Sequence, residues 1–230
     1  MQHSSTQTST QASDTFSPTA RSRVRRVPKR ANYDRDLIYS IVDEGYVCHI
    51  AFVVEAQPYV IPTAYGRLDD HIYIHGSPLS RMMRTLSQGV DVCLTVTLLD
   101  GLVLARSAFH HSMNYRSVVI FGTATLVQDL EQKQVALRAF SEQLVPGRWA
   151  DARPPTTAEL AATTVLALPL TEASAKVRSG PPKDDHADYA LPIWAGEIPL
   201  EQAAQAPVRD PQLPTRVALP DYLKHYLNMD

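Results

Sequence analysis

Between residues 46 and 76 the chain carries three strand-like apolar segments in quick succession, and this pattern constrains the fold more than any other. The segments are "YVCHIAFVV" (46–54), "QPYVIPTAY" (57–65) and "HIYIHG" (71–76), joined only through Glu55–Ala56 and through "GRLDD". Joins this short connect antiparallel strands, because a parallel crossover needs about a dozen residues or more. We therefore predict that the three segments are antiparallel neighbours.

The rest of the chain adds more strands and a few helices. Further strands are predicted at 91–101, at 114–129 and in "TTVLALPLTEASAKVR" (163–178). Apolar residues at helical spacing, with capping residues and glycine stops, predict helices at 34–45, 80–89, 130–144 and in "TAELAATT" (157–164). About six strands without β–α–β alternation predict a mainly β (α+β) fold, an antiparallel barrel with peripheral helices.

Both ends of the chain differ in composition from the middle. Residues 1–22 are rich in Ser, Thr and Gln, and "RSRVRRVPKR" (21–30) adds six basic residues. We expect 1–30 to be a disordered basic arm lying on an acidic body; a targeting peptide or a polyanion contact is the alternative. Residues 31–180 form the predicted domain. The segment 181–230 is rich in proline, and we expect a wrap or a tail there.

Charge and apolar patterning exclude several partners. A net charge of -2 gives no reason to expect nucleic acid. No apolar run approaches the roughly 18 residues of a membrane helix. Cys48 and Cys93 lie inside apolar runs, as buried thiols do, and this usage favours a reducing, cytoplasmic setting.

The common nucleotide and hydrolase motifs are missing from the sequence. There is no GxGxxG, no Walker loop and no GxSxG elbow. His110 and His111 are adjacent, so on an extended chain they point to opposite faces and do not readily share one ion. We predict no metal site.

Two places combine strand-end geometry with polar groups. Pro62 interrupts "YVIPTAY", which predicts an edge strand or a bulge with free backbone groups. In "YIHGSPLSRMMR", His75 and Gly76 end a strand, and Ser80 and Arg81 begin a helix. Free amides, a hydroxyl and a guanidinium suit a phosphate; a routine capped helix with Arg81 in solvent is the alternative.

A third place is "NYRSVVIFGTA" (114–124), where Arg116 and Ser117 precede an apolar run. We expect them at the start of the strand, either as a solvated strand end or as a docking point for an anionic group. Together the three places put polar and cationic groups at one end of an apolar sheet, a pattern that suits a planar ligand bearing a phosphate.

Four stretches carry a family resemblance: "YVIPTAYGRLDDHIYIHGSPLSRMMR", "NYRSVVIFGTATLV", "FSEQLVPGRW" and "TTAELAATTVLALPL". From about Arg30 to Gly180 the sequence resembles the pyridoxamine-phosphate-oxidase-related flavoproteins, and within them the nitroimidazole-resistance reductase branch.

The resemblance implies a six-stranded split β-barrel homodimer with FMN in a cleft between subunits. It also implies an oxidoreductase that reduces small, electron-poor, nitroaromatic-like substrates with electrons from a nicotinamide donor. His75 would be the catalytic proton donor beside the ring. The implied FMN-binding residues are Pro62, Thr63, Tyr65, His75, Gly76, Ser80, Arg81, Arg116, Ser117 and Lys176.

The sequence departs from the phosphate oxidases proper. They carry a lysine directly after the helix-start arginine, where this chain has Met82, and their C-terminal arginine–histidine motif is not evident in "WAGEIPL". Vitamin B6 phosphate oxidation is therefore disfavoured. In "ASAKVRSGPP", Lys176 and Arg178 either face the cleft or are surface charges. The alternatives are a flavin store or redox sensor, a haem-binding split barrel with His75 as axial ligand, and a deazaflavin-using relative.

Overall fold

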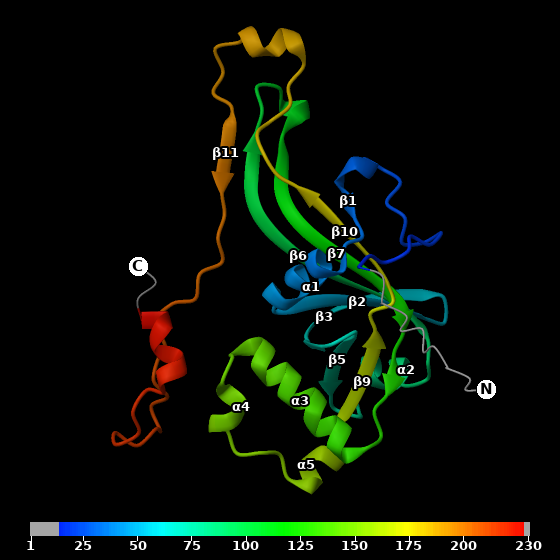
Figure 1. The fold of residues 1–230 in the computed structure, drawn as a ribbon, viewed down its shortest axis with the longest axis vertical. Coiled ribbons are helices and arrows are strands. Elements are labelled where there is room, and N and C mark those ends of the chain that lie inside the picture. The colour runs from blue at the N-terminus through cyan, green and yellow to red at the C-terminus, as the bar shows by residue number, and fades with distance from the viewer. Residues whose placement is uncertain (1–13, 228–230) are drawn as a thin grey trace, which may run out of the picture.

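A computed structural model of the protein describes residues 14–227 and shows a mainly β fold (Figure 1). The α-helices are α1 (Arg35–Glu44), α2 (Arg81–Leu86), α3 (Leu130–Leu144), α4 (Arg148–Asp151) and α5 (Thr157–Ala161). The strands are β1 (Ala31–Asn32), β2 (Val47–Val54), β3 (Gln57–Ala64), β4 (Gly66–Leu68), β5 (His71–Gly76), β6 (Asp91–Leu104), β7 (Ser112–Thr123), β8 (Thr125–Leu126), β9 (Thr164–Pro169), β10 (Glu172–Arg178) and β11 (Gly196–Pro199). Short 3-10 turns are η1 (Pro28–Arg30), η2 (Ala108–His110), η3 (His186–Ala190) and η4 (Asp221–Leu227).

The strands form two antiparallel sheets. The large sheet has the order β1-β10-β7-β6-β2-β3, with β11 added beside the far end of β6. The small sheet has the order β4-β5-β9-β8, and α3 lies across it (Figure 1). Since β3 ends the large sheet, the prediction of an edge strand around Pro62 is confirmed.

The first two predicted strands pair as expected, but the third does not join them. β2 and β3 form a hairpin whose turn residues, Glu55 and Ala56, both have positive φ, as a two-residue turn that follows the strand twist requires. After β3 the chain passes through the buried Tyr65 into the small sheet, where β5 pairs with β4 and β9. Gly66 allows this switch, because a Cβ there would lie 2.5 Å from the Phe140 amide nitrogen of α3.

Two other predicted strands are also divided between the sheets. The segment 163–178 forms β9 in the small sheet and β10 in the large one, separated by the buried Leu170. The segment 114–129 contains β7 and β8, separated by the buried Ala124. β7 begins at Ser112, so the expectation that Arg116 and Ser117 stand at a strand start is wrong: both lie inside the strand.

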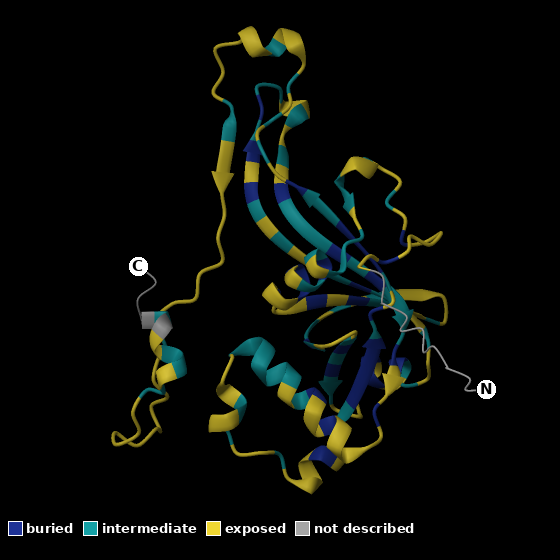
Figure 2. Ribbon diagram, viewed as in Figure 1, coloured by how far each residue is buried: buried dark blue, intermediate teal, exposed yellow. Residues whose placement is uncertain are grey.

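The main core lies between the two sheets and beneath α1 (Figure 2). Asp34 caps α1 as predicted, accepting from the Leu37 amide at 2.8 Å. The side chains of Ile38, Ile41 and Val42 then enter the core beside alternate residues of the large sheet, namely Cys48, Ile50, Val96, Val118 and Ala175. Each of these strands therefore buries one face here, and its other face points away from the core.

Of the predicted basic arm (1–30), residues 14–30 lie against the body of the domain in this structure; residues 1–13 lie outside the described part. Phe16 is 2% exposed and packs edge-on against Tyr39 of α1. Arg21 donates to Glu172 of β10 at 2.8 Å. Within this Ser-, Thr- and Gln-rich segment, Phe16 is an aromatic anchor, and Arg21 adds a polar contact to the large sheet.

Beyond the barrel, β6 and β7 extend as a hairpin that projects from the body, with β11 alongside (Figure 1). The tail is tied to its tip: the Asp184 carboxylate accepts from the amides of Arg106 and Ser107 at 3.0 and 3.3 Å. In the described part of the chain, no helix has the length and the apolar character needed to cross a bilayer.

Candidate functional site

The predicted phosphate contacts lie near the free edge of the large sheet. Ser80 caps α2, but its hydroxyl makes no capping hydrogen bond. Arg81 follows, is exposed, and lies with its guanidinium carbon 5.1 Å from the centroid of the Tyr59 ring on β3. Among the described residues Arg81 has no ion-pair partner, so its charge is available to an anion. α2 spans only six residues, and its dipole adds little.

His75 points away from this edge. On β5, Ile72 and Ile74 enter the main core, so the alternating His75 faces the other side of the small sheet. There its ring packs edge-on against Phe140 of α3, with 4.4 Å between centroids. Burial lowers the pKa of His75. The structure thus separates the predicted proton donor from Arg81, and burial favours the neutral form of its imidazole.

Gly76 and Tyr65 have packing roles in this chain. A Cβ on Gly76 would lie 3.2 Å from the Cγ of Met83, which packs over it from α2. Tyr65 is fully buried, and its hydroxyl donates to the Val42 carbonyl oxygen at 2.5 Å. The Tyr65 side chain is therefore closed to a ring-shaped ligand within one subunit.

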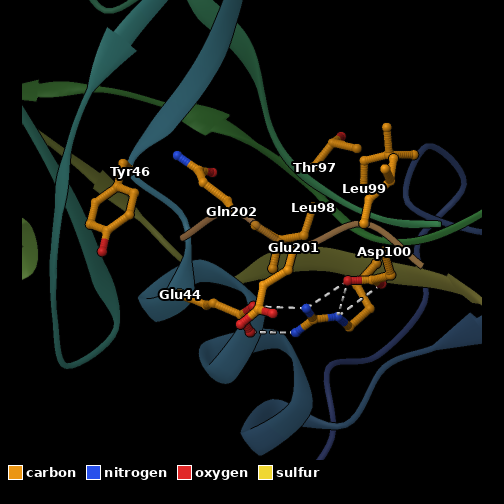
Figure 3. A pocket seen from close by; sticks show the side chains of 10 residues that line it. Glu44, Tyr46, Thr97, Leu98, Leu99, Asp100, Glu201 and Gln202 are labelled. Carbon is orange, nitrogen blue, oxygen red and sulfur yellow. Dashed lines mark hydrogen bonds and ion pairs between the residues drawn. The ribbon is translucent and has the colours of Figure 1, made fainter. Parts of the chain in front are cut away.

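Arg116 lies in a cavity of about 610 Å³ (Figure 3). Its guanidinium bridges two carboxylates, at 2.7 Å from Glu44 Oε1 and 2.8 Å from Asp100 Oδ1. These hydrogen bonds, that of Glu44 first, raise the pKa of Arg116 above its ordinary value. Glu201 of the tail also lines the cavity. Three carboxylates therefore face one guanidinium, which disfavours an anionic ligand here.

Arg116 and Ser117 do not act on one face. They are adjacent in β7, so they point to opposite sides of the sheet. Arg116 faces the α1 side with Glu44, whereas Ser117 faces away from the core, opposite Lys176 of β10. The Ser117 hydroxyl donates to the Lys176 carbonyl at 3.3 Å. The sequence analysis used the alternation of side chains along a strand for His110 and His111, but did not apply it to Arg116 and Ser117.

The side of the large sheet that points away from the core is here called the outward face. Register pairs across the strands place on it Val47, His49, Ala51, Val53, Val60, Pro62, Cys93, Thr95, Ser117, Val119, Phe121 and Lys176. It is mostly apolar, yet Val47, Val53 and Val60 are 49%, 56% and 63% exposed. An apolar sheet face of this size marks a binding surface.

The outward face continues onto the projecting hairpin. Met113 lies on the same side of β7 as Ser117, and its register partner Leu102 pairs in turn with Ile198 of β11. All three are exposed apolar side chains. Of the predicted residues, Pro62, Ser117 and Lys176 lie on the outward face, whereas Thr63 faces inward opposite the buried Cys48.

Near the tip of the hairpin, one group was missed by the sequence analysis. The ligand atoms of His110, Asp185 and Asp188 lie within 4.8 Å of one another, because η2 and η3 meet there. His111 makes a different contact: its Nδ1 accepts a hydrogen bond from the Ala105 amide at 2.9 Å. No local sequence pattern indicates a contact between two segments that lie about 75 residues apart in the chain.

The architecture is that of a split β-barrel, in which two antiparallel sheets enclose one core and few helices lie outside. A family model described as pyridoxamine 5'-phosphate oxidase matches residues 34–177. The chain belongs to this family. No curated protein sequence matches it.

Two solved structures are similar to this chain over nearly its whole length. The flavocytochrome Anf3 from Azotobacter vinelandii is 40% identical with a TM-score of 0.86, covering 91% of this chain and 98% of that one. The FAD- and haem-binding protein from Mycobacterium smegmatis is 34% identical with a TM-score of 0.83, covering 86% and 97%.

The similarity to the nitroimidazole-resistance branch, which the sequence analysis predicted, is weaker than the similarity to these two structures. A candidate 5-nitroimidazole antibiotic resistance protein from Bacteroides thetaiotaomicron is 24% identical with a TM-score of 0.55, covering 64% of this chain and 86% of that one. This likeness shows the fold alone. The motifs quoted from the sequence belong to the shared barrel, so they identified the family but misplaced the branch.

Proposed function

We propose that this protein is a redox flavoprotein that also carries haem, and that it acts as a homodimer. The observation that carries the proposal is the 40% identity to a flavocytochrome across 91% of this chain. The second relative, at 34%, is described as binding FAD and haem. Both relatives favour the haem-binding alternative of the sequence analysis over an FMN reductase.

The chain has groups that fit a flavin phosphate. β3 ends its sheet, so its outer backbone groups are free around Pro62 and Thr63. Arg81 and the Ser80 hydroxyl lie near this edge without a partner among the described residues. In the proposed role Arg81 binds the phosphate and the β3 edge orients the ring, while the flavin supplies the electron-transfer chemistry.

The homodimer is part of the same proposal. The outward face leaves apolar residues in water at a free-energy cost of about 25 cal/mol per Å². Covering it with a second copy removes that cost and gives a cofactor at this face an enclosed, apolar site. Two identical faces meeting about a two-fold axis are the commonest way in which soluble oligomers close.

The proposal is tested by the absorption spectrum of the purified protein, with mass spectrometry of the released cofactors. We expect flavin bands together with a Soret band, and FAD and haem as the released species. A nicotinamide is the expected electron donor, checked by anaerobic reduction. A flavin spectrum without a Soret band, with FMN released, would instead support the reduction of small electron-poor substrates.

A further inference from the structure

We infer that His49 is the side chain of this protein that ligates haem iron. The inference rests on the proposed function, because it names the residue through which the chain would hold the second cofactor. It differs from the sequence-based expectation, which gave the axial role to His75.

His49 lies in the middle of the outward face. Its register partners are Pro62 on β3 and Thr95 on β6, and Thr95 pairs in turn with Val119. The flanking residues on the same face of β2 are Val47 and Ala51. His49 is exposed, and its side chain makes no hydrogen bond to another described residue. An imidazole with a free nitrogen, surrounded by apolar side chains, has the chemistry of an axial ligand to a macrocycle.

Directly beside His49 the outward face is hollowed. A cavity of about 330 Å³ is lined mainly by apolar side chains, including Ala51, Val53, Val60 and Phe121. Ala51 is two residues along β2 from His49, so the cavity adjoins the imidazole on the same side of the sheet. A flat apolar surface ending in a hollow fits a large hydrophobic ring system.

Cations border the same surface, as the carboxylates of haem require. Arg21 lies at the rim of the hollow, 5.4 Å from the centroid of the Phe121 ring. It pairs there with Glu172 at 2.8 Å and, more loosely, with Asp91 at 3.9 Å, a carboxylate that also lines the hollow. Lys176 lies on the outward face next to Ser117, and no ion pair engages it among the described residues. Apolar walls with cations at the edges match an apolar macrocycle whose charge is confined to two side groups.

The other histidines whose side chains the structure describes fit the role less well. His71 lies on β5 of the small sheet, where its ring centroid is 6.1 Å from that of Tyr73. The ring of His75 packs edge-on against Phe140 of α3. The Nδ1 of His111 accepts a backbone amide hydrogen, which leaves the proton of the neutral ring on Nε2. His110 lies 3.4 Å from Asp185. His186 is exposed on η3, away from the sheet, and it is the competing candidate.

The position of His49 also fits electron transfer between the proposed cofactors. Its partner Pro62 stands on the edge strand to which the flavin is assigned. Because His49 and Pro62 are register partners on neighbouring strands, the residues that would hold the two cofactors adjoin each other.

The test compares His49→Ala with His186→Ala and His75→Ala in the full chain, each purified with its cofactors. The readouts are haem per subunit, the Soret maximum and flavin per subunit. For His49→Ala we expect haem binding to fall and flavin to be retained. The fall should be at least roughly ten- to hundred-fold, because altering a residue that only supports a metal ligand already has an effect of that size. Added imidazole should restore the Soret band of His49→Ala, which a merely unfolded variant would not allow.

Unchanged haem content and Soret maximum in His49→Ala would overturn the inference, as would loss of haem in His186→Ala or His75→Ala instead. The failure of the proposed function is a separate result: it would be seen as the absence of a Soret band from the unaltered protein, and the inference would fall with it.

Discussion

The two faces of the large sheet are made from similar residues but lie in opposite surroundings. On β2, the inward Cys48 and Ile50 are fully buried, while the outward Val47 and Val53 are half exposed. α1 and the small sheet cover the inward face, and no described segment covers the corresponding outward region. The comparison separates what the fold needs from what the function needs: one face stabilises a subunit, and the other is available to a partner and cofactors.

The largest effect is expected from removing an anchor of the inward core. Phe16→Ala should lower the free energy of unfolding by about 3–5 kcal/mol, because it takes a buried ring from beneath α1. Phe109→Ala is the matched control, since its ring is 89% exposed, and should change stability little. Urea unfolding measures both; equal small effects would mean that the N-terminal segment does not dock.

A charge on the outward face should separate the subunits without unfolding them. Val60→Lys places an ammonium at a position that is open in one subunit but covered in the proposed dimer. An unpaired buried charge costs roughly 3–5 kcal/mol, so the dissociation constant of the dimer should rise by about two to four orders of magnitude. Sedimentation equilibrium measures it, with Val208→Lys, on the exposed tail, as control. A dimer as tight as the original would place the interface elsewhere.

For the proposed phosphate contact we expect Arg81→Ala to weaken binding of a phosphate-bearing flavin more than of riboflavin. A charge-assisted hydrogen bond is worth about 1.5–3 kcal/mol, which corresponds to a roughly ten- to hundred-fold loss. Arg84→Ala, one turn further along α2, is the control. Titration by flavin fluorescence compares the ligands, and equal losses for both would assign Arg81 to the fold.

The smallest effect concerns acid stability. Burial lowers the pKa of His75, so below pH 6.5 the unfolded chain takes up a proton that the folded protein resists. The stability that the neutral His75 contributes is therefore fully present above pH 6.5 and is lost as the pH falls. The free energy of unfolding should change by at most about 1.4 kcal/mol per pH unit from this group. His75→Phe should flatten the profile of unfolding free energy between pH 6.5 and 5. An unchanged slope would mean that other groups set it.

Local patterns predicted most of the fold. Spacing and caps located α1 and α3, and the Glu55–Ala56 turn fixed the first hairpin. The errors in strand assignment have one cause, which is that alternation shows that a strand has a buried face but not which sheet it joins. Tyr65, Ala124 and Leu170 mark the places where the chain changes sheets, and each reads in sequence as one more strand residue.

The candidate site was predicted less completely than the fold. Arg81 and Pro62 could be proposed from the sequence because a helix start and an edge proline have local signatures. His49, the haem ligand proposed from the structure, was not proposed from the sequence, since a histidine within "YVCHIAFVV" has no motif around it. Only the pairing of β2 with β3 and β6 shows that it stands on the exposed, apolar side.

The most direct measurement of the central claim is the mass of the native protein with its cofactors, by native mass spectrometry. The account predicts a dimer of about twice 25.5 kDa that carries flavin and haem on each subunit. A single chain of 25.5 kDa without bound cofactor would contradict it, because the apolar outward face would then have neither partner nor ligand.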